Sequence, residues 1–119
     1  HPALADERLQ AWRLYGALFF GATKLVEELE DHLPPHTLVL DLKNVIYLDS
    51  TGAEALESLV HACRKQGVRL VVSGLMNQPR DIVVRTGLLA QFTERSAEDL
   101  QPDVASAVLS AASAMDTPP

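Results

Sequence analysis

Residues 37–72 constrain the fold most strongly, because they give the pattern of a strand, a polar turn, a helix and a second strand in immediate succession. Residues 37–42 are mostly apolar and favour β-structure, which predicts a core strand. From Ala53 the apolar side chains recur at helical spacing until Gly67, a residue type that ends helices in the left-handed conformation. Residues 68–72 are again mostly apolar and rich in valine. Two strands joined by a helix form a parallel crossover, so we predict an α/β fold.

The polar turn between the first strand and the helix is Asp49-Ser50-Thr51-Gly52. Thr51 and Glu54 have the spacing of a capping box, and Asp49 or Ser50 can also cap free backbone N–H groups. Open α/β sheets place ligand and partner sites at the edge where the chain leaves a core strand. We therefore predict that these four turn residues form an interaction site at the start of the helix.

The segment before this unit predicts two short strands and a helix. Residues 9–15 are compatible with β-structure, and Gly16 allows a bend before a second apolar run at residues 17–20. We expect these two strands to be antiparallel to each other. The helix that begins at Gly21 is amphipathic, and the proline pair at positions 34–35 ends it.

The segment after the central unit predicts shorter elements. A helix is expected at residues 80–86, with Asn77 or Gln78 as its cap. Residues 92–94 suggest a brief edge strand, and the last helix either begins or is kinked at Pro102. Together these elements predict a mixed, mainly parallel sheet with about four packed helices.

Length and composition predict one domain over residues 1–119, with a core at about 9–115 and frayed ends. The 16 acidic residues exceed the 10 basic ones and give a formal net charge of −6, which argues against a nucleic-acid partner. The single cysteine, Cys63, lies on the apolar face of the central helix, so an internal disulfide is excluded. No apolar run reaches membrane-spanning length, and we expect no direct insertion of these residues into a membrane.

The strand, turn and helix together resemble the STAS domain, a family that comprises anti-sigma factor antagonists and the cytoplasmic C-terminal domains of SulP-type anion transporters. The resemblance also includes the amphipathic helix and the valine-rich strand that follow the turn. The strand and turn residues that carry it are Leu40, Asp41, Leu42, Leu48, Asp49, Ser50, Thr51 and Gly52. It covers roughly residues 9–115 in the expected order of elements.

Residues 16–22, Gly-Ala-Leu-Phe-Phe-Gly-Ala, resemble the entry into the first helix of the STAS domains of bacterial SulP transporters. Anti-sigma factor antagonists usually have a Gly-x-Leu-Asp segment there. The resemblance implies a regulatory, protein-interaction role in transport of a sulfate- or dicarboxylate-class anion. The expected partners are a membrane domain in the same polypeptide and a cytoplasmic regulatory protein, and the expected location is the cytoplasmic face of the inner membrane. The alternative is a free-standing anti-sigma factor antagonist.

The same resemblance implies a regulatory role for Thr51 and Ser50. In the antagonists the hydroxyl residue before the glycine is phosphorylated by the partner kinase, and Thr51 has that position here. Phosphate would add charge at a helix N-terminus and change an interface without refolding the domain. The structural alternative is that Ser50 and Thr51 only cap the helix. No cofactor is predicted, and nucleotide binding would have to use the turn itself, since the chain has no phosphate-binding loop.

The chain gives no pattern typical of an enzyme or a metal site. Ser50 lacks the histidine base and orienting carboxylate that a nucleophile needs, and the four histidines do not have metal-ligand spacing. We therefore predict no catalytic residue and no metal ligand. A second predicted partner surface combines the polar face of the central helix with the preceding strand, and its residues are Lys43, Asn44, Glu57 and His61.

Overall fold

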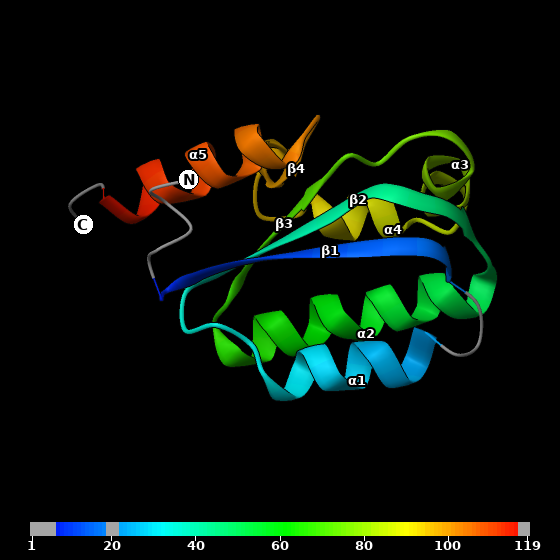
Figure 1. Ribbon diagram of the computed structural model, residues 1–119, viewed down its shortest axis with the longest axis horizontal. Helices are drawn as coiled ribbons and strands as arrows, with labels where there is room; N and C mark the ends of the chain where they lie inside the picture. Colours follow the sequence, from blue (N-terminus) through cyan, green and yellow to red (C-terminus); the bar gives the residue numbers. More distant parts are fainter. Residues whose placement is uncertain (1–6, 19–21, 117–119) are drawn as a thin grey trace.

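The structure, a computed structural model, describes residues 7–18 and 22–116. It contains a parallel sheet of four strands in the order β1-β2-β3-β4 (Figure 1). The strands are β1 Leu9–Leu18, β2 Thr37–Leu48, β3 Arg69–Ser73 and β4 Leu100–Gln101. The helices are α1 Ala22–Asp31, α2 Ser50–Gln66, α3 Asn77–Arg85, α4 Leu88–Phe92, the 3-10 helix η2 Ala97–Asp99 and α5 Val104–Asp116.

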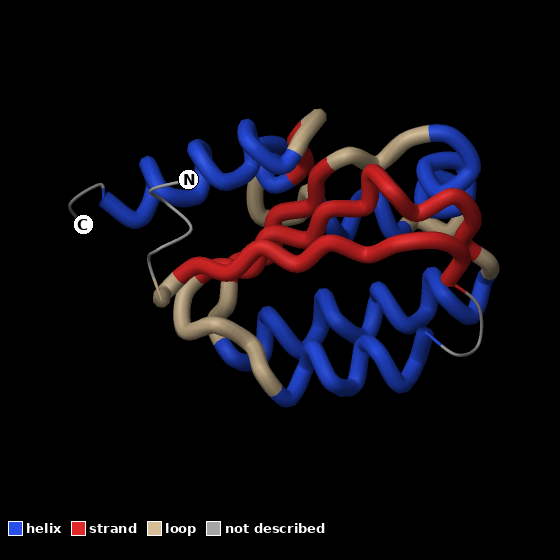
Figure 2. Tube along the Cα trace, viewed as in Figure 1, coloured by secondary structure: helices blue, strands red, loops and turns tan. Residues whose placement is uncertain are grey.

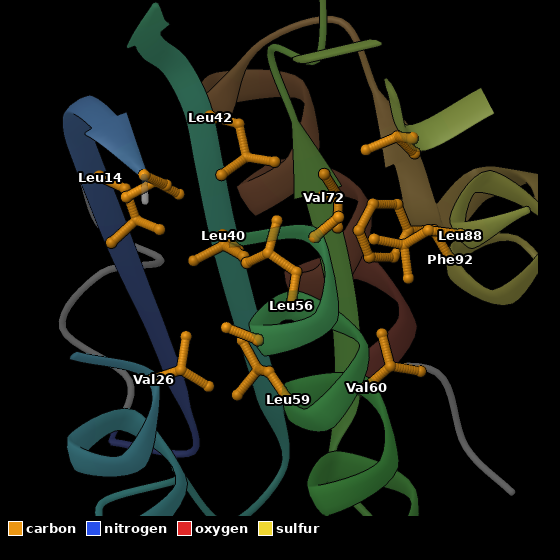
Figure 3. Packing of buried hydrophobic residues seen from close by; sticks show 14 of the residues in the cluster. Leu14, Val26, Leu40, Leu42, Leu56, Leu59, Val60, Val72, Leu88 and Phe92 are labelled. Atoms are coloured by element: carbon orange, nitrogen blue, oxygen red, sulfur yellow. The ribbon is translucent and has the colours of Figure 1, made fainter. Parts of the chain in front are cut away.

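The sheet lies between two helical layers (Figures 1 and 2). Helices α1 and α2 pack side by side on one face, where they bury the larger hydrophobic cluster together with residues of α3 and α4. Figure 3 shows Leu56 and Leu59 of α2 in this cluster, close to Leu40 of β2. On the opposite face, α5 buries a smaller cluster formed by Leu9, Val39, Val71, Ala107, Val108 and Ala111. Alternation along each strand therefore supplies apolar side chains to both layers.

The predicted crossover from β2 through α2 to β3 is confirmed, because the two strands pair in parallel from Thr37 with Arg69 to Asp41 with Ser73. Gly67 ends α2 with a φ of 71°, and its N–H bonds to carbonyl oxygens of the last turn. This left-handed conformation is accessible to glycine at little cost. The predicted α/β single-domain class is likewise confirmed.

The two antiparallel strands predicted at the start of the chain are wrong, because β1 is one strand over Leu9–Leu18 and pairs in parallel with β2. Gly16, with a φ of 79°, lies between two register shifts. The predicted bend is therefore absorbed as an irregularity inside a continuous ladder. All three strand pairs within the described residues are parallel, so the sheet that they form is not mixed. Phe19, Phe20 and Gly21, which carried part of the sequence resemblance, lie outside the described residues.

The last third of the chain differs from the prediction in three places. Residues 92–94 form no strand, because Phe92 ends helix α4 and packs in the larger core cluster. The edge strand is instead β4, where Leu100 and Gln101 pair with β3. Helix α5 neither begins nor kinks at Pro102: it begins at Val104, and a carboxylate oxygen of the preceding Asp103 accepts a hydrogen bond from the backbone N–H of Ser106.

Candidate functional site

The helix that follows β2 begins at Ser50, three residues earlier than the sequence pattern predicts. Asp49 is its N-cap, and the Oδ1 atom of Asp49 accepts a hydrogen bond of 2.8 Å from the backbone N–H of Gly52. The predicted Thr51 capping box is therefore wrong, while the alternative of a cap by Asp49 is confirmed. The predicted polar turn is the first turn of α2, and its backbone is fixed by the cap.

Gly52 lies where the first turn of α2 touches the ends of β1 and β2. A Cβ atom on Gly52 would lie 2.6 Å from the carbonyl oxygen of Leu18 and 2.6 Å from Cδ1 of Leu48. The backbone N–H of Asp49 also donates to the Leu18 carbonyl, at 3.2 Å. A glycine is therefore needed here for close approach of the helix to the strands, not for an unusual backbone conformation.

Gln78 holds the end of β2 from the side of α3. Its Oε1 atom accepts a hydrogen bond of 2.8 Å from the backbone N–H of Leu48, and its Nε2 atom donates one of 2.8 Å to the Leu48 carbonyl. The sequence assigned Gln78 or Asn77 as the cap of α3, but Asn77 is the first residue of that helix and Met76 precedes it without a side-chain cap. Gln78 is thus a positioning residue for the α2 start, and a lone glutamine gives no sequence signal for this role.

The two hydroxyl residues after the cap differ in exposure, since Ser50 is exposed whereas Thr51 is half-buried. A depression of about 200 Å³ lies beside Ser50, and its lining residues are Ser50, Ala53, Glu54, Glu57, Thr86 and Leu88. A phosphate on Ser50 would gain from the N-terminal end of the helix dipole and would be repelled by the two glutamates. Ser50 is therefore the more accessible hydroxyl, and modification of either residue stays a prediction.

The structure does not bring the four residues of the second predicted partner surface together. Lys43 lies on β2 near the start of α5, where hydrogen bonds from Ser106 lower the pKa of Asp103 and the charge of Lys43 adds a smaller effect in the same direction. Asn44 is its half-buried neighbour. His61 is exposed on α2, which packs on the opposite face of the sheet from α5 (Figure 1). Any single partner would have to reach around the sheet to contact both groups.

Glu57 belongs to a polar link between α2 and α4. It accepts a hydrogen bond of 2.7 Å from Nε2 of Gln91. Arg64, two turns further along α2, donates to the Gln91 carbonyl at 2.9 Å and forms an ion pair with Glu94. Glu57 therefore contributes to packing between helices, which the sequence prediction of a partner residue did not include.

A buried carboxylate, Asp41, lies in the middle of β2 with 2% of its surface exposed. Its Oδ1 atom accepts hydrogen bonds from the backbone N–H of Lys43 at 3.1 Å and from the Ser73 hydroxyl at 3.3 Å. Its Oδ2 atom accepts one from Nε of Arg13 at 3.1 Å. Burial of a carboxylate is costly unless it is paired and hydrogen-bonded, and Asp41 is both. The sequence signal was an aspartate between two leucines of a core strand.

No cluster of three or more His, Cys, Asp or Glu side chains that could hold a metal occurs within residues 7–18 and 22–116. Cys63 is buried, and this burial, with a smaller effect of Glu30, raises the pKa of its thiol to about 11. The thiol is therefore protonated at neutral pH and is a packing group. Among the described helices, none is long and apolar enough to cross a membrane.

The family model of the STAS domain matches residues 6–107. The chain belongs to the STAS domain family. The match begins before β1 and ends within α5, so it includes the whole sheet and the start of α2. The resemblance inferred from the strand, turn and helix is thus confirmed.

Related proteins connect this STAS domain with anion transporters. The putative sulfate transporter YvdB of Bacillus subtilis is 31% identical over 94 residues, a match that covers 74% of this chain and 18% of YvdB. The chain therefore spans less than a fifth of the length of that relative. The STAS domain of a SulP transporter from Vibrio cholerae is 25% identical, with a TM-score of 0.78 over 93% of this chain and 86% of that one.

Two further solved structures share the fold at lower identity. A sulfate transporter family protein from Wolinella succinogenes has a TM-score of 0.82 and 23% identity, over 94% of this chain and 91% of that one. The murine anion transporter Slc26a9 has a TM-score of 0.73 and 20% identity, over 91% of this chain and 18% of the transporter. In both structures the matched part has the same fold as this chain.

Proposed function

We propose that this STAS domain is the non-enzymatic regulatory domain of a SulP-type anion transporter and acts on transport of a sulfate- or dicarboxylate-class anion. The observation that carries the proposal is the match to a limited part of YvdB, a putative sulfate transporter of which the aligned segment covers 18%. The rest of such a protein would supply the membrane domain. The domain would then lie on the cytoplasmic face of the cell membrane.

The start of α2 is the surface that we assign to regulation. The cap by Asp49, the close approach at Gly52 and the two hydrogen bonds between Leu48 and Gln78 fix the backbone on both sides of Ser50. A surface that is already ordered costs less conformational entropy when a partner binds it. The exposed Ser50, together with the half-buried Thr51, would therefore contact the membrane domain of the same polypeptide or a cytoplasmic regulatory protein.

The proposal is tested by uptake of radiolabelled sulfate and of a labelled dicarboxylate in cells that express the natural full-length product. We expect Ser50→Ala, Thr51→Ala and Thr51→Glu variants to change the uptake rate at equal amounts of protein in the membrane. Ser58→Ala is the matched control, because Ser58 lies on the same helix and bonds to Glu30 instead. Unchanged uptake in all three site variants would contradict a regulatory role for the α2 start.

The alternative function is that of a free-standing anti-sigma factor antagonist that is switched by phosphorylation at Thr51. It is supported by the sequence Asp49-Ser50-Thr51-Gly52 alone. Capture of an anti-sigma kinase by the native protein, together with phosphate on Thr51 in mass spectra, would support this alternative. Recovery of the native protein without a kinase partner and without phosphate on Thr51 would count against it.

A further inference from the structure

The face of the sheet that α5 covers is only partly filled. Helix α5 packs on the first half of the strands, against Leu9, Val39 and Val71. Arg13 and Tyr15 follow on β1, and both are exposed, with 66% of the Tyr15 surface accessible. Ala11 and Arg13 share a face because they are two apart on the strand, and Tyr15, which follows the register shift, lines the same pocket as these two residues.

A pocket of about 370 Å³ lies between α5 and β1 at this place. Its volume is within the range of roughly 300–1,000 Å³ that is typical of small-molecule sites. The lining residues are Ala11, Trp12, Arg13, Tyr15, Asp41, Val104, Ala105 and Val108. The wall from α5 is wholly apolar, while β1 and β2 contribute the polar and charged groups, which is the composition expected of a ligand pocket.

Arg13 is the charged group of this pocket that can bind a ligand. Asp41 is 2% exposed, and both of its oxygens already accept hydrogen bonds from Arg13, Lys43 and Ser73. Arg13 donates its Nε–H to Asp41 and also hydrogen-bonds with the side chain of Tyr15, and 49% of its side chain stays exposed. A guanidinium has five N–H donors, so these two interactions leave capacity for a further acceptor. A cationic ligand would instead be repelled by Arg13, and it could not pair with the Asp41 carboxylate because both of its oxygens already accept hydrogen bonds.

We propose that this pocket binds a small apolar carboxylate whose hydrocarbon part packs against Ala105 and Val108 and whose carboxylate accepts hydrogen bonds from Arg13. Planar guanidinium and carboxylate groups are complementary in shape, which favours this anion. The hydroxyl of Tyr15, which lines the same pocket, is a second donor for it. Binding at this pocket does not depend on the proposed role in transport, because it rests on the geometry of the described domain alone.

The test is a titration of the ¹⁵N-labelled chain with sodium octanoate, followed by amide chemical shifts. We expect saturable shifts at residues 11–15 and 104–108. 1-Octanol, a neutral molecule with the same chain length, should bind at least ten-fold more weakly, since a hydrogen bond to a charged group contributes more than one to a neutral group. Saturable shifts confined to other residues, or equal binding of octanol and octanoate, would overturn the proposal.

Variants separate the two parts of the pocket. Ala105→Phe fills the apolar wall from an exposed position of α5, so it should leave the fold intact and abolish the octanoate shifts. Arg13→Lys keeps a positive charge beside Asp41 but loses the planar guanidinium with its paired N–H donors, and we expect its affinity for octanoate to be at least five-fold weaker. Arg85→Gln, on the exposed surface of α3, is the control and should bind as the natural chain does. Undiminished octanoate binding by Ala105→Phe would refute this site.

Discussion

Gly52→Ala should destabilise the domain, although alanine is the better helix former. The added Cβ atom would lie 2.6 Å from the Leu18 carbonyl oxygen and 2.6 Å from Cδ1 of Leu48. Unstrained contacts between carbon atoms are about 3.5–4.0 Å, so the distance to Cδ1 of Leu48 is short by close to 1 Å. Neither neighbour can retreat easily, because the carbonyl accepts a hydrogen bond from Asp49 and Leu48 is fully buried.

The expected free-energy change follows from two opposing terms. Overpacking of a closely packed contact costs about 1–3 kcal/mol. Replacing glycine by alanine inside a helix recovers at most about 0.5–1 kcal/mol. With the middle of each range, about 2 and about 0.75 kcal/mol, the net loss for Gly52→Ala is about 1.2 kcal/mol. With a urea m-value of roughly 2 kcal/mol/M, the midpoint of unfolding should fall by about 0.6 M.

The assay is urea unfolding followed by circular dichroism, with Gly67 as the matched comparison. Gly67 has a φ of 71°, and a Cβ atom added to it would have no atom within 4 Å apart from those of its chain neighbours, so alanine there costs stability through backbone strain. Asparagine tolerates the left-handed conformation, so Gly67→Asn should be more stable than Gly67→Ala. At Gly52 the larger asparagine should be worse than alanine. A Gly52→Ala protein as stable as the natural chain would refute the close-approach argument.

Four further predictions concern single side chains. Asp49→Ala should lower the free energy of unfolding by about 1 kcal/mol through loss of the α2 cap, measured by urea denaturation. Asp99→Ala should cost about 3–5 kcal/mol, because it leaves the buried Arg69 without its partner at 2.9 Å, and calorimetry would show the lower Tm. Cys63, whose pKa burial raises to about 11, should not react with Ellman's reagent at pH 8 until urea unfolds the chain. Hydrogen bonds from Ser106 lower the pKa of Asp103, so the stabilisation by the Asp103 carboxylate is present at neutral pH and is lost as the pH falls through that lowered pKa. The Asp103→Asn variant should therefore lose less of its urea unfolding midpoint when the pH is lowered.

The central unit was predictable because its signals are local. The apolar run of β2, the helical spacing of Leu56, Leu59, Val60 and Cys63, and the stop at Gly67 each act within a few residues, and the structure confirms them. The start of α2 was misplaced because Asp49, Ser50 and Thr51 are all good caps. Only the three-dimensional position of Gly52 against the strand ends decides that Asp49 is the cap used.

The parts that the sequence did not predict depend on distant partners. The antiparallel prediction for residues 9–20 used local turn preference, whereas β1 forms its ladder with β2, about thirty residues further along the chain. Gln78 holds Leu48 at a separation of 30 residues, and Arg13 meets Asp41 at a separation of 28. Contacts of this kind leave no periodic trace in the sequence, so neither the positioning of the α2 start nor the pocket beside α5 was foreseen.

The central claim, that this STAS domain belongs to a SulP-type anion transporter, is tested most directly by the mass and membrane partitioning of the native full-length product. An antibody against this domain would detect the product in fractionated cells. We expect a species several times heavier than this chain that remains in the membrane fraction and is released by detergent. A soluble species of about 13 kDa would contradict the claim and would direct attention to an anti-sigma kinase and to Thr51.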